Sequence, residues 1–117
     1  MRPRKVVANL NVADVQEAKA FYQDFLGLSV EEFSLGWVAR FTSPDGEVSV
    51  QLVSGDATSR VDSDLSLMVD DVDAAYAEAL AAGHEIVHPL TTEAWGPRRF
   101  FVRAPDGHVV NVVQHHG

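Results

Sequence analysis

Polar side chains that could hold an organic ligand recur at alternate positions of strand-like stretches. Asparagine and glutamine each donate and accept hydrogen bonds, so they suit the carbonyl, hydroxyl and amide groups of a ligand. Alternation puts such side chains on one face of a strand and apolar side chains on the other. The amides at these positions are Asn9, Gln51 and Asn111. Asp64, at the start of a further strand-like stretch, adds one carboxylate.

Two tryptophans are the aromatic side chains best suited to stack on a flat ligand. Trp95 lies in residues 91–97, a stretch of loop-forming residues in which we expect no strand or helix face for it to pack on. An exposed ring there could stack on a planar ligand, and a lid plug or a dimer contact is a close alternative. Trp37 follows Gly36 at the start of an expected strand, where core packing is the stronger explanation.

Side chains typical of nucleophilic or metal-dependent catalysis are not arranged in a motif. The chain has no cysteine, which excludes a disulfide framework, a thiolate metal site and a cysteine nucleophile. No serine has the context of a nucleophile elbow. The spacing of the five histidines matches no helix-borne metal motif, and solvated surface positions explain them best. An acid/base role stays open for Asp64 and for Glu93, which lies near Trp95 in the sequence.

Length and composition predict one compact domain. The 117 residues are enough for a hydrophobic core, and no apolar run reaches the length of a membrane span. We see no signal peptide at the N-terminus, and we expect a cytoplasmic protein. The net charge of −8 argues against a nucleic-acid partner, which requires a basic surface. The charge is compatible with a cationic ligand, although solubility is the simpler explanation.

A duplicated pattern indicates two similar modules, which we assign to residues 1–55 and 62–117, with the polar stretch 54–63 as the linker. In each module an aspartate, Asp14 or Asp71, precedes a helical stretch, and a Pro-Asp-Gly turn precedes the last strand. A half-module of this kind needs a partner to bury its open face. The seam between two modules is a natural place for a ligand.

Each module is expected to contain one helix and four strands. The first helix follows Asp14 and stops at Gly27, and the second covers about 72–82. Strands are expected at residues 5–12, 28–33, 36–43, 47–53, 64–69, 85–91, 97–104 and 108–114. The helical spacing predicts a buried stripe on the first helix made of Val15, Ala18, Phe21, Tyr22, Phe25 and Leu26.

Two segments resemble signatures of the vicinal oxygen chelate superfamily, the group of glyoxalases, bleomycin-resistance proteins and extradiol dioxygenases. The family's opening strand and helix are similar to Asn11-Val12-Ala13-Asp14 followed by Phe21-Tyr22 and Leu26-Gly27-Leu28. Its closing hairpin is similar to Arg99-Phe100-Phe101-Val102-Arg103-Ala104-Pro105-Asp106-Gly107. The resemblance covers essentially the whole chain. It implies an α+β fold in which two tandem βαβββ modules form curved mixed sheets around a cleft, and it implies a homodimer. One fold hosts many functions, so the chemistry needs separate evidence.

The resemblance allows a test for the metal site of the family's metal-dependent branch. There the ligands are His, Glu or Gln side chains on the first and last strands of each module. Those positions fall here on Val7, Gln51, Asp64 and Asn111. Valine cannot bind a metal, the amides are weak donors, and only Asp64 is a good ligand. We therefore expect no metal and no other cofactor, and glyoxalase and dioxygenase activities are disfavoured.

Without a metal, the concave face is interpreted as a pocket with mixed apolar and amide walls. For the strand at 97–104 we expect Arg98, Phe100 and Val102 to face this cleft and Phe101 to face the core. The candidate ligand-binding residues are Asn9, Trp37, Gln51, Asp64, Met68, Trp95, Arg98, Phe100 and Asn111. No catalytic residue is assigned.

The function that fits these features is binding without catalysis. We expect a cytoplasmic protein of the bleomycin-resistance type that sequesters an aromatic antibiotic or natural product by ring stacking and amide hydrogen bonds. Its partners are this small ligand and a second copy of the chain, with no nucleic acid and no membrane. The alternatives are a metal-independent lyase or isomerase that uses Asp64 or Glu93, and a metalloenzyme with unconventional ligands.

Overall fold

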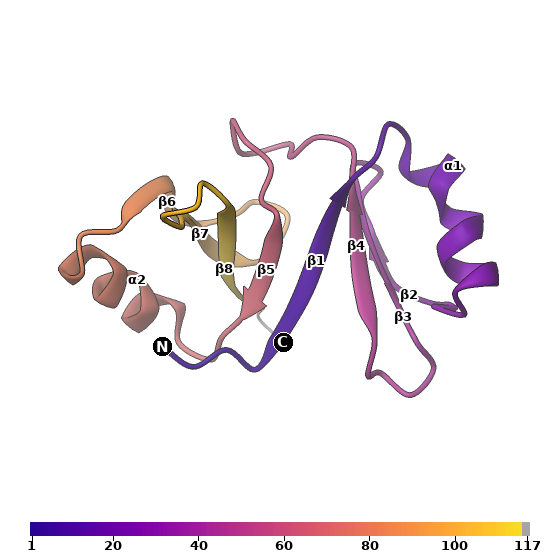
Figure 1. Ribbon diagram of the computed structural model, residues 1–117, viewed down its shortest axis with the longest axis horizontal. Helices are drawn as coiled ribbons and strands as arrows, with labels where there is room; N and C mark the ends of the chain where they lie inside the picture. Colours follow the sequence, from indigo (N-terminus) through magenta and orange to yellow (C-terminus); the bar gives the residue numbers. More distant parts are fainter. Residues whose placement is uncertain (116–117) are drawn as a thin grey trace. The chain divides into compact units, whose positions relative to one another are not determined.

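The structure is a computed structural model that describes residues 1–115, and Figure 1 labels its helices and strands. The chain forms two compact units. The first unit is Val7–Asp62, and the second unit is Met1–Val6 together with the described chain from Ser63 onward. His116 and Gly117, which the sequence pattern assigns to the second module, lie outside the described residues.

The first unit folds in the order β1 (Lys5–Asn11, of which Lys5 and Val6 belong to the second unit), α1 (Val15–Ala20), η1 (Phe21–Phe25), β2 (Val30–Ser34), β3 (Val38–Thr42) and β4 (Ser49–Val53). Strand β1 pairs with β4 in parallel, and β3 pairs antiparallel with both β2 and β4. Parallel strands cannot be joined by a tight turn, so the chain between β1 and β4 crosses over through α1.

The second unit repeats this order with β5 (Leu65–Met68), α2 (Val72–Ala81), β6 (Glu85–Thr92), β7 (Arg98–Arg103) and β8 (Val109–Gln114). Strand β5 pairs with β8 in parallel, and β7 pairs antiparallel with both β6 and β8. Parallel and antiparallel pairs therefore coexist in each unit's sheet. The α+β class and the βαβββ order expected from the sequence are confirmed.

An aspartate caps each α-helix, as the duplicated pattern predicts. The Asp14 carboxylate accepts a hydrogen bond from the Glu17 backbone N–H at 3.1 Å, and Asp71 accepts one from Ala74 at 3.0 Å. These bonds satisfy N–H groups that have no partner inside the helix. Within residues 1–115, no helix is long and apolar enough to span a membrane.

The first helix departs from the predicted pattern after Ala20. Phe21–Phe25 form a π-helical turn, in which the Leu26 N–H donates to the Phe21 carbonyl at 3.1 Å. This wider turn changes the phase of the side chains, so Tyr22 still packs against the core while its neighbours turn outward. The exposed fractions are 55% for Phe21, 77% for Phe25 and 45% for Leu26. The prediction that these three side chains are buried is wrong.

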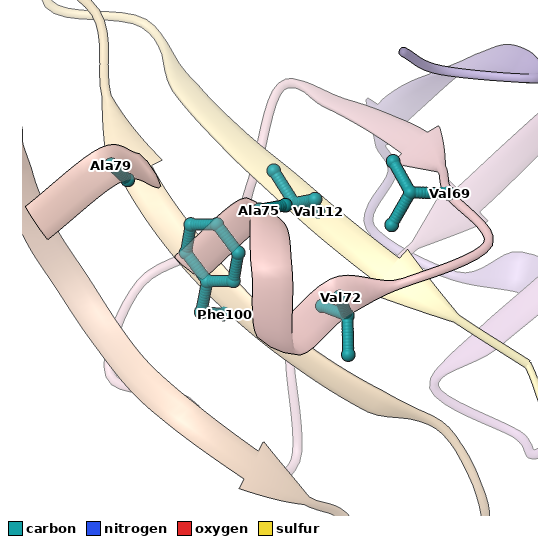
Figure 2. Close-up of a cluster of buried hydrophobic side chains, with 6 residues drawn as sticks. All are labelled: Val69, Val72, Ala75, Ala79, Phe100 and Val112. Carbon is teal, nitrogen blue, oxygen red and sulfur yellow. The ribbon is translucent and has the colours of Figure 1, made fainter. Parts of the chain in front are cut away.

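Each unit has its own hydrophobic core, between one face of its sheet and its helix. The buried members in the first unit are Val15, Leu28, Ala39, Phe41 and Leu52. Those in the second unit are Val69, Val72, Ala75, Ala79, Phe100 and Val112, and Figure 2 shows them between α2 and the strands beside it. The opposite face of each sheet carries a different set of side chains, which form the candidate site.

The two Pro-Asp-Gly turns are built alike. Gly46 and Gly107 each donate a backbone hydrogen bond of 2.9 Å to the carbonyl three residues back. Their φ angles of 78° and 95° lie in the left-handed region, which glycine adopts without strain. The carboxylates of Asp45 and Asp106 each accept a hydrogen bond of 3.0 Å from the backbone N–H two residues further on.

These hydrogen bonds predict a pH-dependent contribution to stability. The pKa of Asp45 lies below its usual range, chiefly because its carboxylate also accepts a hydrogen bond from the Ser43 hydroxyl. The pKa of Asp106 lies below its usual range, chiefly because its carboxylate accepts the hydrogen bond from the His108 backbone N–H. A carboxyl whose pKa is lowered by folding stabilises the folded protein at pH values above the pKa of the unfolded state. That stabilisation is lost as the pH falls through the pKa of the folded state. We expect asparagine at both positions to lower the urea midpoint at about pH 7, and to lower it less at about pH 3.

The matched control is Asp24→Asn, which changes an exposed carboxylate of η1 that takes no part in either turn. Its difference from the wild-type midpoint is expected to stay small at both pH values. If the double variant differed from wild type equally at both values, the aspartates would contribute turn geometry and no charge-dependent stability.

Candidate functional site

The face of the first-unit sheet opposite α1 carries a row of polar side chains. Pairing aligns Asn9 of β1 with Gln51 of β4, and Gln51 with Arg40 of β3. Leu52, next to Gln51 in the sequence, belongs to the core under α1. Because side chains alternate along a strand, Gln51 and its two partners lie on the helix-free face.

Hydrogen bonds join this row into a continuous network. The Gln51 amide Nε2 donates to Asn9 Oδ1 at 2.8 Å, and Arg40 Nε donates to Gln51 Oε1 at 2.8 Å. Arg40 Nη1 donates to Glu32 at 3.1 Å, and the Thr42 hydroxyl donates to the same carboxylate at 2.7 Å. The sheet thus brings together Asn9 and Gln51, two of the predicted site residues, and adds three that the sequence analysis did not assign.

Glu32 reaches this network because β2 is irregular at that point. The β2–β3 pairing passes from Glu31–Phe41 to Phe33–Arg40, so Glu32 is an extra residue in the strand. Such a bulge redirects a side chain, and here it places the carboxylate beside the Arg40 guanidinium. Burial lowers the pKa of Arg40, and the hydrogen bond and charge of Glu32 oppose that change. Arg40 is therefore a largely buried cation on the sheet face, and Glu32 supplies a carboxylate of opposite charge beside it.

The second unit carries a corresponding row. Pairing aligns Ser66 of β5 with Asn111 of β8, and Asn111 with Phe101 of β7. Asn111 therefore occupies the place that Gln51 holds in the first unit. Its Nδ2 donates to the Ser66 hydroxyl at 3.0 Å. Its Oδ1 is buried and has no hydrogen-bond partner among the described residues.

Trp95 lies in the turn between β6 and β7, and this turn is closed by backbone hydrogen bonds. The Glu93 N–H donates to the Pro97 carbonyl at 2.8 Å, and the Gly96 N–H donates to the Glu93 carbonyl at 3.0 Å. The indole ring of Trp95 packs on the guanidinium of Arg99, whose Cζ lies 5.0 Å from the ring centroid. The expectation that Trp95 has no strand face to pack on is therefore wrong, because Arg99 of β7 provides one.

Arg99 is held from three sides. Its Cζ lies 4.7 Å from the Phe101 ring centroid, and its Nε donates to the Glu93 carboxylate at 2.6 Å. The same carboxylate oxygen lies 3.1 Å from His88 Nε2. Only 3% of the Arg99 side chain and 4% of the Glu93 side chain are exposed. This buried cluster fixes the position of the Trp95 turn, and it gives Glu93 a structural role.

The predicted orientation of β7 is wrong. Phe100 packs in the core under α2, with its ring centroid 5.0 Å from that of Tyr76, and Figure 2 shows Phe100 beside Ala75 of α2. Arg98 lies on the same strand face and donates to the Asp73 carboxylate of α2 at 2.9 Å. Neither residue shares a face with Asn111. The run Arg-Arg-Phe-Phe-Val-Arg does not alternate, so only the pairing with β8 decides which side chains face α2.

The other three predicted site residues are spread over the two units. Met68 of β5 is half-buried and shares the strand face of Ser66 by alternation. Asp64 is exposed, and its carboxylate accepts a hydrogen bond from the Val109 N–H at 2.8 Å. Trp37 is half-buried directly before β3, and its carbonyl accepts a hydrogen bond from the Ser54 N–H at 2.9 Å.

The residues that sequence reasoning missed carried one usable signal. Arg40 stands inside the run Trp37-Val38-Ala39-Arg40-Phe41-Thr42, where a charged residue in an otherwise apolar strand indicates a buried, partnered side chain. Nothing local identifies its partner Glu32, because that contact depends on the bulge in β2. The contact between Arg99 and Trp95 likewise depends on how the turn folds back on β7.

The positions that the resemblance assigns to metal ligands do not fit a metal ion. Val7 is fully buried and apolar. The Gln51 amide is committed to Asn9 and Arg40. The Asp64 carboxylate accepts a backbone hydrogen bond. In the part of the chain that the structure describes, no group of three or more His, Asp or Glu side chains gathers closely enough to hold a metal.

Residues 5–112 match the family profile of the Glyoxalase/Bleomycin resistance protein/Dioxygenase superfamily. No curated protein sequence matches the chain.

Solved structures with the same fold cover nearly the whole chain. A superfamily member from Vibrio splendidus 12B01 is 23% identical, with 94% of this chain and 97% of that chain covered and a TM-score of 0.67. A methylmalonyl-CoA epimerase from Mycobacterium tuberculosis is 21% identical, with coverages of 98% and 90% and a TM-score of 0.72. An NAD-dependent benzaldehyde dehydrogenase from Legionella pneumophila is 19% identical, with coverages of 96% and 100% and a TM-score of 0.77. These similarities concern the fold alone.

The Arg40 network predicts that Glu32 matters more for stability than its neighbour. Glu32→Ala removes the carboxylate that offsets the burial of Arg40 and accepts from Thr42. We expect a loss of about 1–3 kcal/mol in the free energy of unfolding, measured by urea denaturation.

The matched control is Glu31→Ala, which removes a carboxylate one residue away that pairs with Lys19 at 3.1 Å near the surface. Its cost is expected to stay below about 1 kcal/mol. Equal costs for the two variants would mean that Arg40 does not depend on Glu32.

Proposed function

Because the chain belongs to the glyoxalase/bleomycin resistance protein/dioxygenase superfamily, we propose that it is a binding protein of the bleomycin-resistance type. In this proposal it sequesters an aromatic antibiotic or natural product, without a metal ion and without changing the ligand chemically. A homodimer in the cytoplasm is the proposed functional form.

The observation that carries the proposal is the buried amide oxygen of Asn111. Asn111 is 7% exposed, and its Oδ1 has no hydrogen-bond partner within residues 1–115. A buried acceptor without a partner costs about 1–3 kcal/mol. The oxygen itself has almost no exposed surface, so a ligand reaches it only when the side chains over it move. A hydroxyl or amide N–H of such a ligand then removes this cost.

Trp95 supports the aromatic character of the ligand. Arg99 covers one part of the indole and is itself fixed by Glu93, so the ring is held in place before any ligand arrives. Trp95 is half-buried, which leaves part of the residue accessible. A ring that is already ordered stacks on a planar ligand with little loss of conformational entropy.

The first-unit network supports recognition of polar groups on a ligand. Replacing a buried ionic group by well-packed apolar residues often leaves stability unchanged or raises it, so the burial of Arg40 is poorly explained by stability alone. Arg40 also stacks on Phe33, with its Cζ 5.0 Å from the ring centroid. A guanidinium fixed in this way suits a carbonyl or phenolate oxygen of a ligand.

The binding test uses the intrinsic fluorescence of Trp95. In a Trp37→Phe variant Trp95 is the only tryptophan, and stacking of a planar ligand is expected to quench it. The protein is titrated with bleomycin-, mitomycin- and enediyne-like compounds and with flavins. We expect at least one dissociation constant below about 1 mM, with the compound recovered unchanged after incubation. Binding weaker than that across the whole panel, or conversion of the bound compound, would contradict the proposal.

The role of Asn111 is tested with the tightest ligand of that panel. Asn111→Val removes the unpartnered oxygen and introduces a β-branched residue, which a strand accommodates well. We expect the dissociation constant to rise about tenfold. Ser66→Ala is the matched control, because it removes the partner of Nδ2 and leaves Oδ1 in place. Similar losses of affinity in the two variants would show that Oδ1 does not contact the ligand.

A further inference from the structure

A separate pocket lies on the other face of the second-unit sheet, between the sheet and α2. Its volume is about 340 Å³. The walls are mostly apolar, and they come from β5, β7, β8 and α2. The side chains that define it are Leu67, Ala75, Ala79, Phe100, Val102 and Val110. Phe100 and Val112 belong both to this lining and to the core shown in Figure 2.

The pocket follows from the small side chains of α2. The buried residues of this helix that face the sheet are Val72, Ala75 and Ala79, which are all small. Tyr76 adds a partly buried ring, whose centroid lies 5.0 Å from that of Phe100. A helix packed through alanines leaves space that larger side chains would fill.

The first unit shows how the same place can be filled. Its helix follows Asp14 as α2 follows Asp71, and Tyr22 stands as many residues after its cap as Ala79 does. Tyr22 packs against the first-unit core. The corresponding position in the second unit therefore has only a methyl group. Phe100, which corresponds to Ala39 by the strand pairing, and Tyr76, which packs on Phe100, fill only part of the difference.

The polar groups at this pocket are already engaged or lie at its edge. Arg103 donates to Glu85 at 3.0 Å and to the Gly107 carbonyl at 3.2 Å. Glu78 accepts from the terminal ammonium at 2.6 Å. His84 is exposed just after the end of α2. The apolar interior thus excludes a charged ligand, since a charge buried there would have no partner.

The volume limits the size of the occupant. An apolar cavity of about 150 Å³ holds a benzene molecule, and pockets for organic ligands begin at about 300 Å³. We propose that this pocket is a second binding site, which takes a compact neutral molecule of one or two rings with any polar group directed toward His84. The site is independent of the sheet face that carries Asn111 and does not rest on the proposed function.

Indole is a suitable probe, because it is neutral, bicyclic and soluble in water. Titration is followed by NMR of the methyl groups of Ala75, Ala79 and Val112, all of which line the pocket. We expect shifts at these three methyls that saturate in the millimolar range or below. Absence of saturable shifts there, or shifts centred on Met68 and Val113 of the opposite face, would overturn the proposal.

Ala79→Tyr places in α2 the residue that stands at the corresponding position of the first unit. We expect it to weaken indole binding at least about tenfold and to raise the melting temperature, because it fills the pocket. Ala79→Leu serves the same purpose if tyrosine is too large for the space.

The matched control is Ala77→Tyr, which adds the same side chain at an exposed position of α2 that does not line the pocket. Its indole affinity is expected to equal that of the wild type. Indole binding that survives both Ala79 variants, or that falls equally in the control, would overturn the proposal. Quenching of Trp95 by the antibiotic panel is expected to persist in Ala79→Leu. Loss of indole binding therefore tests the second site, and loss of Trp95 quenching tests the proposed function.

Discussion

The parallel pairing of the first and last strands within each unit is the constraint on which the rest of the structure depends. Strands β1 and β4, and likewise β5 and β8, run in the same direction. Such a pair needs a crossover connection, and the helix in that connection covers one face of the sheet. Each sheet therefore has a face whose side chains form the core with a helix and a face that is left for other contacts.

The same pairing decides which polar residues meet. It aligns Asn9 with Gln51 and Ser66 with Asn111, so an amide of the last strand faces a polar side chain of the first strand in both units. Beyond this shared arrangement the units differ. The Gln51 oxygen accepts from Arg40, whereas the corresponding place in the second unit holds Phe101, which offers no donor to Asn111. This difference between β3 and β7 explains why both amide atoms of Gln51 have partners, whereas the buried Asn111 oxygen has none among residues 1–115.

Features governed by a few neighbouring residues could be predicted from the sequence. The caps at Asp14 and Asp71 and the two Pro-Asp-Gly turns depend on backbone groups within three residues. The predictions failed where a tertiary contact or a change of helix type decides. The π-helical turn exposes Phe21 and Phe25, although their spacing suits a buried stripe.

The candidate site shows the same division. Asn9, Gln51 and Asn111 could be found because an amide on an otherwise apolar strand is conspicuous. The orientation of Arg98 and Phe100 could not, because only the pairing of β7 with β8 fixes it. Arg40 meets Glu32 because of a bulge in β2, and Trp95 meets Arg99 because the turn folds back on β7. The spacing of neighbouring residues predicts neither contact.

Incomplete packing and incomplete hydrogen bonding occur together in the second unit. On one sheet face the Asn111 oxygen lacks a partner among residues 1–115, and on the other face alanines leave a pocket of about 340 Å³. The unpartnered oxygen and the unfilled pocket each cost free energy in the empty protein. A ligand that pairs the oxygen or fills the pocket stabilises the folded state to a degree set by its concentration relative to its dissociation constant. In the first unit, Tyr22 packs in the core and Gln51 has partners for both of its amide atoms. The two units therefore share one strand order and differ in how completely their described side chains fill the space under the helix and pair the amide of the last strand.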